Sequence, residues 1–210
     1  MNLRTVRLTA EWAAFFFLVP LLFYFDLLPV PKVLALVAAS LGIAAALWRD
    51  AGYSFAGDWK GEAGAGEWKS LALRGCAVAA AILTLTLLVQ PGQLLGFPQG
   101  APWRWGMVML LYPFLSALPQ ELLYRSWFFR RYRPLFGAEA GMVLASALSF
   151  SFLHVIYDNP WALGLSFAGG LLFASTYRRS RSLMVVAAEH ALYGCLVFTI
   201  GMGGYFYEPF

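Results

Sequence analysis

Residues 119–125 read PQELLYR and follow an apolar run from Met107 to Leu118. The amide, carboxylate and guanidinium therefore fall at what looks like membrane depth, where a charged side chain is costly unless it is paired or faces a polar cavity. Glu121 and Arg125 are four residues apart, so a helix places them on one face. Gln120 points about 100° away from that pair. The segment predicts either a structural ion pair that neutralises itself or a functional site inside a membrane.

The composition is that of a polytopic membrane protein. Of 210 residues, 60% are hydrophobic and only 12% are charged, and the mean hydropathy is +0.66, well outside the range of soluble globular domains. The net charge is +4, but the basic residues gather in particular loops and form no patch with interleaved aromatic residues. They indicate membrane topology rather than nucleic-acid binding. We expect a lipid bilayer around the protein and no nucleic-acid partner.

Several apolar segments are long enough to cross a membrane as a helix, which needs about 20 residues. Pro and Gly between them mark helix boundaries. The candidates are Thr9–Leu28, Pro31–Trp48, Leu71–Val89, Trp105–Phe129, Ala138–Tyr157, Trp161–Tyr177 and Leu183–Gly201. We therefore predict an all-α, polytopic membrane helix bundle with about seven transmembrane helices.

Basic residues precede the first candidate span and follow the second, fourth and sixth. The positive-inside rule then places the N-terminus in the cytoplasm. Short loops favour a bacterial plasma (inner) membrane. Within one integral membrane domain, we expect residues 1–104 to supply N-terminal helices and a cytoplasmic loop, and residues 105–202 to form the helical core that holds the candidate site. The one long hydrophilic segment, residues 50–68, is predicted to be flexible or partly interfacial.

The other polar groups of interest lie in the later spans. The chain has two histidines, His154 near the end of the fifth span and His190 in the seventh. A lone histidine is most often a hydrogen-bonded core residue. Two histidines together with a carboxylate and a guanidinium favour a catalytic site instead. A carboxylate with an imidazole can activate water, and a second imidazole can donate to an oxyanion.

The order of these motifs resembles the CAAX-processing and bacteriocin-processing (CPBP, or Abi) intramembrane endopeptidases. That order is a Glu-x-x-x-Arg box, a Phe-x-x-x-His segment, a Gly-Gly span and a last histidine after Ser-Leu. In this chain the matching segments are Glu121–Arg125, Phe150–His154, Gly169–Gly170, and Ser182–Leu183 leading to His190. Each motif alone is weak, but four in this order, one to a span, are fairly specific. The resemblance covers roughly residues 105–200.

The resemblance implies a glutamate-dependent protease, once taken for a metalloprotease, that hydrolyses a peptide bond of a membrane-anchored protein or peptide. It implies that His154 and a carboxylate of the box activate water, that His190 donates to the oxyanion, and that Arg125 orients Glu121. Members of the family act on prenylated C-termini, leader peptides and sorting-signal proteins. Nothing in the sequence distinguishes among these substrates.

Two positions depart from the family pattern. The first carboxylate of the box is Gln120, and the Asn expected four residues after the last histidine is Gly194. Glutamine cannot accept a proton, so either Glu121 serves as the base, with Gln120 as an orienting or oxyanion group, or the fold is kept without the reaction. We favour the first. Glu189 and Glu11 are the other carboxylates that can substitute, although Glu11 lies near the start of its span and is better explained by snorkelling toward the interface.

No cofactor is expected. Two histidines and a carboxylate would suffice for a zinc ion with a bound water. However, the sequence lacks His-Glu-x-x-His and each histidine is alone on its span, so a metal-free mechanism is favoured. Two other functions stay open. One is a catalytically silent relative with a binding, immunity or regulatory role. The other is a small transporter with a proton relay, which the absence of an inverted repeat disfavours.

Overall fold

Helices make up almost all of residues 2–206, the part of the chain that the structure, a computed structural model, describes; no strand occurs within it. The predicted all-α class is confirmed. The longer helices are α3 (Lys32–Trp48), α5 (Ala65–Val89), α11 (Ala140–Leu153), α12 (Pro160–Ser180) and α13 (Leu183–Ile200). Shorter ones join end to end: α1 (Leu3–Ala13), η1 (Ala14–Leu18) and α2 (Val19–Tyr24), then α7 (Pro102–Tyr112), η3 (Pro113–Ala117), α8 (Leu118–Glu121), η4 (Leu122–Trp127) and α9 (Phe128–Arg131). The connecting turns are α4 (Phe55–Lys60), η2 (Pro91–Gln93), α6 (Gly96–Gly100), α10 (Arg133–Phe136), η5 (His154–Tyr157) and η6 (Gly203–Phe206).

Within residues 2–206, five helices are long and apolar enough to cross a membrane. They are Leu3–Tyr24, Ala65–Val89, Pro102–Arg131, Ala140–Tyr157 and Leu183–Ile200. Each predicted span coincides with a helix, but α3 has only 17 residues and α12 is not among the five. The count of seven spans therefore stays a prediction.

Caps define the ends of the two helices that follow the first histidine. Asn159 precedes Pro160 and accepts a hydrogen bond from the backbone N–H of Ala162 at 2.8 Å, which starts α12. Ser182 accepts from the N–H of Val185 and starts α13. Between them, Arg181 has φ 49°, the left-handed conformation that ends a helix. These signals fix where α12 and α13 turn back against each other.

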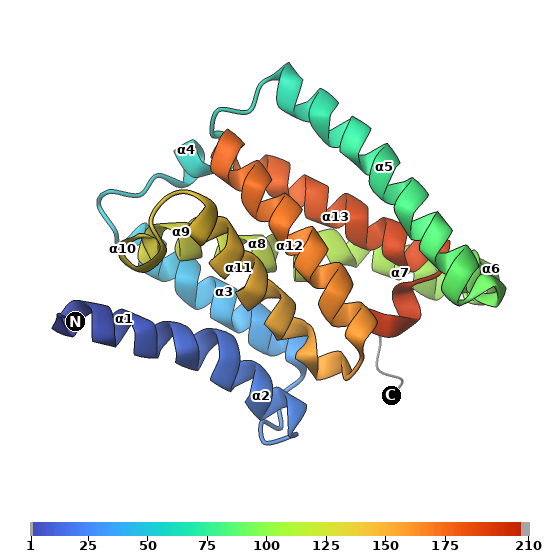
Figure 1. Ribbon diagram of the computed structural model, residues 1–210, viewed down its shortest axis with the longest axis horizontal. Helices are drawn as coiled ribbons and strands as arrows, with labels where there is room; N and C mark the ends of the chain where they lie inside the picture. The colour runs from blue at the N-terminus through green and yellow to red at the C-terminus, as the bar shows by residue number, and fades with distance from the viewer. Residues whose placement is uncertain (1, 207–210) are drawn as a thin grey trace.

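α11, α12 and α13 lie side by side, with α5 along α13 (Figure 1). Gly170 lets α11 and α12 approach closely, because a Cβ there would lie 3.0 Å from the Cα of Ala147. On the other side of the bundle, Phe16 is 2% exposed and packs edge-on against Tyr124 and Phe128. The core thus lies around the helix that contains PQELLYR.

The hydrophilic segment after α3, predicted to be flexible or partly interfacial, is partly helical and makes specific contacts with the bundle. It contains α4, and the carboxylate of Asp58 in that helix accepts hydrogen bonds from the hydroxyls of Tyr53, Ser126 and Tyr177. Ser126 directly follows Arg125, so α4 is tied to the end of the helix that carries the candidate site. Composition alone does not reveal these contacts, because Ser126 and Tyr177 lie 68 and 119 residues away from Asp58 along the chain.

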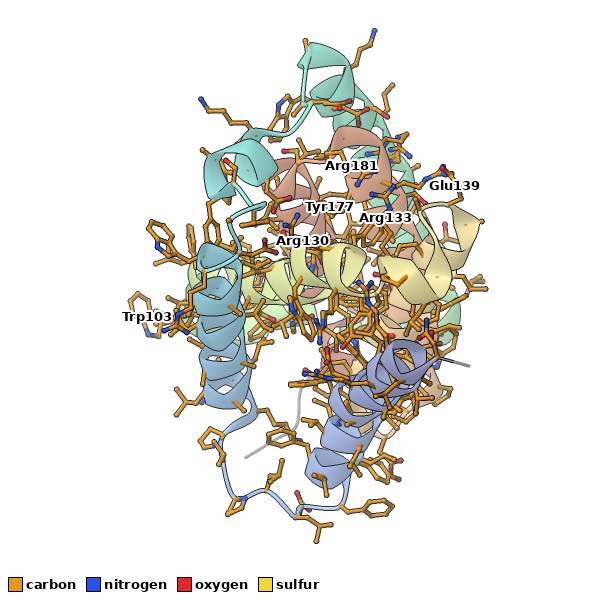
Figure 2. The ribbon with its side chains drawn as sticks, turned by 90° about the vertical axis from the view of Figure 1, so that its left-hand side faces the viewer. Trp103, Arg130, Arg133, Glu139, Tyr177 and Arg181 are labelled. Atoms are coloured by element: carbon orange, nitrogen blue, oxygen red, sulfur yellow. The ribbon has the colours of Figure 1, made fainter. Side chains whose placement is uncertain are left out.

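Charged residues gather at the end of the bundle covered by α4, where Figure 2 labels Arg130, Arg133, Glu139 and Arg181. Arg130 donates to Asp50 at 2.7 Å and, with the N–H of Gly52, lowers the pKa of Asp50 to about 2. The lowered pKa means that this contact is present at neutral pH and is lost as the pH falls toward about 2. That this end faces the cytoplasm of a bacterial cell stays a prediction.

We predict that Asp58→Ala releases α4. Loss of hydrogen bonds to a charged group costs about 2–3 kcal/mol, so amide hydrogen exchange in residues 54–61 should accelerate about 30-fold or more. Lys60→Ala is the matched control, because Lys60 is an exposed residue of the same helix. Unchanged exchange in Asp58→Ala would show that the hydroxyl contacts do not hold the segment.

Candidate active site

The helix from Pro102 to Arg131 is continuous but not regular. Two π-helical stretches, η3 and η4, lie on either side of α8, the short segment that holds Gln120 and Glu121. Pro113 and Pro119 have no N–H to donate to the preceding turn, which favours widening of the helix there. π-Helical turns change the direction of side chains and are frequent at functional sites. Here they determine which way the side chains of residues 120–125 point.

Glu121 and Arg125 form the predicted pair, and both side chains are 0% exposed. Nε of Arg125 lies 3.0 Å from Oε2 of Glu121. The guanidinium carbon lies 4.9 Å from the ring centroid of Phe150 and 5.6 Å from that of Phe173. Among residues 2–206 the guanidinium nitrogens make no well-aligned hydrogen bond, so the cation is stabilised by the opposite charge and the two ring faces.

His190 holds the other oxygen of Glu121. Its Nδ1 lies 2.7 Å from Oε1 of Glu121, and its Nε2 lies 2.9 Å from the hydroxyl of Tyr112. Because an ionised carboxylate only accepts, Nδ1 carries the hydrogen, and in the neutral imidazole Nε2 then accepts from Tyr112. The ring also stacks on Phe173 at 4.6 Å. Sequence reasoning missed Tyr112, since a tyrosine in an apolar span carries no special signal.

His154 lies apart from this chain of contacts. It begins η5, is 8% exposed, and its Nδ1 donates to the carbonyl of Phe150 at 2.8 Å. A carbonyl only accepts, so the neutral ring has its lone pair on Nε2. The hydrogen bond of Glu121 goes to His190 and not to His154, although the resemblance paired His154 with a carboxylate of the box.

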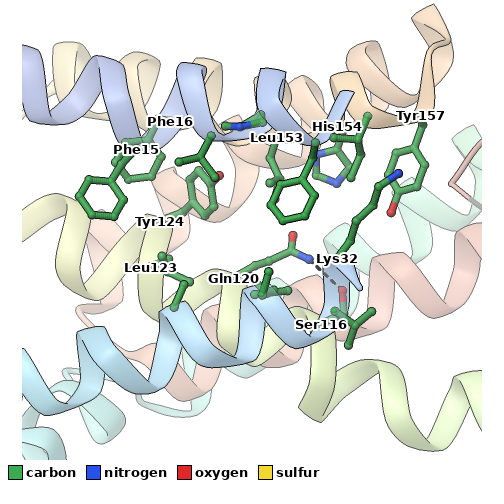
Figure 3. Close-up of a pocket in the computed structure, with 18 residues that line it drawn as sticks. Phe15, Phe16, Lys32, Ser116, Gln120, Leu123, Tyr124, Leu153, His154 and Tyr157 are labelled. Carbon is green, nitrogen blue, oxygen red and sulfur yellow. Dashed lines mark hydrogen bonds between the residues drawn. The ribbon is translucent and has the colours of Figure 1, made fainter. Parts of the chain in front are cut away.

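Gln120 and His154 instead share a cavity of about 220 Å³ (Figure 3). Its walls come from η1, α2, α3, the segment from η3 to η4, and the junction of α11 with η5, and most of the lining is apolar. Its polar lining residues are Lys32, Ser116, Gln120, Tyr124, His154 and Tyr157. No carboxylate belongs to the lining within residues 2–206. The cavity therefore combines an apolar interior with a small polar end.

Gln120 turns one polar atom into this cavity. It is 7% exposed, and its Nε2 donates to the hydroxyl of Ser116 at 2.8 Å. Its Oε1 has no hydrogen-bond partner among the described residues and points into the space that His154 also lines (Figure 3). Oε1 of Gln120 and Nε2 of His154 are both acceptors. The polar end thus suits a small molecule with two donor hydrogens, such as water.

The remaining candidate carboxylates are engaged elsewhere. Glu189 is fully buried, accepting from Nε of Arg74 at 2.8 Å and from the hydroxyl of Tyr193 at 2.9 Å. Glu11 accepts two hydrogen bonds from Arg131, so it is paired rather than simply snorkelling. Across residues 2–206, no group of three or more His, Cys, Asp or Glu side chains is arranged to bind a metal ion.

Residues 102–196 match the family model of the type II CAAX prenyl endopeptidase Rce1-like proteins. In this segment the chain is similar to the CAAX prenyl endopeptidases. The match begins at the first residue of α7 and ends within α13, so it contains all of the candidate site residues. The resemblance that the motif order predicted is confirmed. No curated protein and no solved structure gives a significant match to the chain.

The similarity to this protease family over residues 102–196 and the apolar helices together support an integral membrane protein. The matched region includes the cavity residues Ser116, Gln120, His154 and Tyr157, whereas the opposite wall comes from η1, α2 and α3, outside the match. Apart from Lys32, the polar lining of the cavity therefore belongs to the matched region, and much of the apolar lining lies outside it.

We predict that Arg125→Met destabilises the protein by about 3–5 kcal/mol, because it leaves the Glu121 carboxylate buried without its cation. Adding Glu121→Gln should recover part of this loss. The measurement is the free energy of unfolding in detergent micelles. Arg178→Met is the control, since Arg178 pairs with Glu139, which is 82% exposed, and should cost less than about 1 kcal/mol. Equal losses from Arg125→Met and Arg178→Met would contradict a stabilising buried pair.

Proposed function

We propose that the protein is an intramembrane endopeptidase that hydrolyses a peptide bond of a membrane-anchored protein or peptide in the cavity of Gln120 and His154. The observation that carries this proposal is the pair of acceptors at one end of an apolar cavity, Oε1 of Gln120 and Nε2 of His154. The similarity of residues 102–196 to a protease family supports the reaction class.

The apolar wall supports entry of the substrate from the bilayer. Phe15 and Val33 line the cavity from the first helix and from α3, yet they are 49% and 50% exposed. Because both residues reach the cavity and the surface, the cavity opens between these two helices. In a membrane such an apolar surface faces lipid. A substrate segment held in the bilayer can then reach Gln120 and His154 without leaving it.

In the proposed reaction, water donates one hydrogen to Nε2 of His154 and the other to Oε1 of Gln120. His154 takes the first proton as the water oxygen attacks the peptide carbonyl carbon, and returns it to the amine nitrogen as the C–N bond breaks. The carbonyl of Phe150, 2.8 Å from Nδ1, stabilises the imidazolium formed in between. Tyr157 lines the same cavity, and its hydroxyl is a candidate donor to the oxyanion.

This assignment differs from the one that the family resemblance implies. Glu121 is fully buried, with one oxygen on His190 and the other beside Arg125. It does not line the cavity, and in the proposal it orients the neighbouring groups and takes no proton. His190 is likewise bound at both nitrogens. The base is therefore His154, and Gln120 orients the water without accepting a proton.

A second function has one observation in its favour, the absence of a carboxylate from the described lining of the cavity. A chain with this fold can bind a membrane-anchored peptide without hydrolysing it and act in regulation or immunity. The two functions differ in what the wild-type protein does to a bound peptide: an endopeptidase cleaves it, whereas a binding protein releases it intact.

We predict that purified wild-type protein in lipid nanodiscs cleaves a membrane-anchored peptide, and that His154→Ala lowers kcat by about 10²–10⁴-fold. Gln120→Leu should lower kcat as well, because it removes the acceptor that orients the water. Gln120→Glu should retain or raise it, because it adds a carboxylate to the cavity. The measurement is product formation by mass spectrometry over a library of anchored peptides.

Ser151→Ala is the matched control for these variants. Ser151 lies three residues before His154, in the last turn of α11, donates to the carbonyl of Leu163 and does not line the cavity. Its kcat should stay within about threefold of wild type. Peptide binding without cleavage by wild type, with cleavage gained in Gln120→Glu, would replace the endopeptidase by the binding protein. Full activity of His154→Ala would contradict the proposed base.

A further inference from the structure

Gly194 lies inside α13, where glycine costs about 1 kcal/mol relative to alanine. Its backbone does not require glycine, because the positive φ values among the described residues do not include it. The reason for glycine at this position is the packing of α13 against the helix that carries Tyr112. A Cβ at position 194 would lie against Cε1, Cζ and the hydroxyl oxygen of Tyr112. Tyr112 therefore occupies the space that a side chain at 194 would need.

The same hydroxyl reaches the candidate site. Gly194 is one turn beyond His190 on α13, and the Tyr112 ring lies across that turn, edge-on to His190 at 5.9 Å and to Phe198 at 5.6 Å. This position brings the Tyr112 hydroxyl 2.9 Å from Nε2 of His190. A methyl group at 194 would displace the ring and break this contact. The hydrogen bond between Tyr112 and His190 therefore depends on the absence of a side chain at position 194.

The hydrogen bond completes a chain of contacts that joins two helices. From Tyr112 it runs to His190, then to Glu121, and from Glu121 to Arg125. Tyr112 and Glu121 belong to the helix of residues 102–131, and His190 belongs to α13. The imidazole is therefore held at both nitrogens by groups nine residues apart on one helix. This contact restrains the rotation of α8 against α13.

We propose that Tyr112 is a positioning residue of the site, admitted by Gly194, whose hydroxyl holds His190 on Glu121 and thereby keeps α8 turned so that Gln120 faces the cavity. Gln120 directly precedes Glu121, so a rotation that frees Glu121 also moves Oε1 of Gln120. The effect on turnover rests on the proposed function, whereas the hydrogen bond and the role of Gly194 do not.

The test uses full-length protein in nanodiscs with two single variants and their combination. Tyr112→Phe removes one oxygen and keeps the ring, and Gly194→Ala adds one methyl group against that ring. With a cleaved peptide, each single variant should lower kcat about tenfold with KM within about twofold, as expected for the loss of one hydrogen bond. The double variant should be no worse than the worse single variant, because both changes break the same contact.

A spectroscopic measurement separates this proposal from the proposed function. The chain has two histidines, so ¹⁵N-histidine labelling gives two sets of imidazole signals, which His154→Asn assigns. The Nε2 signal of His190 should shift in Tyr112→Phe and in Gly194→Ala, while the signals of His154 stay in place. This result is expected whether or not any peptide is cleaved.

Tyr193→Phe is the matched control, because Tyr193 is a buried tyrosine of α13 whose hydroxyl bonds to Glu189 instead. It should leave the His190 signals unchanged. An unshifted Nε2 signal in folded Tyr112→Phe overturns the proposal. If the losses of kcat in the two single variants multiply in the double variant, the proposal that Gly194 admits the Tyr112 ring is overturned. If wild type cleaves no peptide but the His190 signal shifts, the proposed function fails and the role of Tyr112 in holding His190 stands.

Discussion

The buried ion pair of Glu121 and Arg125 constrains the whole C-terminal half of the bundle. Removing two charges from water costs several kcal/mol each, and their attraction offsets this only when the surroundings engage both groups. Three helices supply those surroundings: Phe150 comes from α11, Phe173 from α12 and His190 from α13. The close approach of α11 to α12 at Gly170 serves the same arrangement.

The contacts that stabilise the Glu121–Arg125 pair also determine the direction of the neighbouring Gln120 side chain. Glu121 turns toward α13 and is fully engaged, so Gln120, about 100° around the helix, turns the other way into the cavity. The π-helical stretches on either side of α8 allow this segment to take its own orientation within a long helix. A neutral amide in an apolar cavity also avoids the cost of a second buried carboxylate next to the first.

Much of this arrangement follows from the sequence, and some of it does not. The all-α class, the Glu121–Arg125 pair and the resemblance to the CAAX endopeptidases were predicted and are confirmed, because helical spacing and motif order can be read directly from the sequence. The partner of Glu121 was not predictable, since spacing within one helix does not determine which histidine of another helix faces it. Tyr112 and the docking of Asp58 were missed for the same reason.

Other expectations stay predictions. The number of spans, the cytoplasmic N-terminus, the division at residues 104 and 105, and the metal-free mechanism depend on the bilayer or on chemistry rather than on side-chain contacts within residues 2–206. The roles of Gln120, His154 and His190 in hydrolysis are likewise predictions.

Labelling with a membrane-permeant carbodiimide, which modifies carboxyl groups in apolar surroundings, tests most directly whether Glu121 is sequestered behind the cavity. The readout is mass spectrometry of the peptide that spans residues 119–125. We predict no label on this peptide in the wild-type protein, and a label at position 120 in Gln120→Glu. A label on Glu121 in the folded wild-type protein would contradict the sequestered carboxylate and return Glu121 to the role of base.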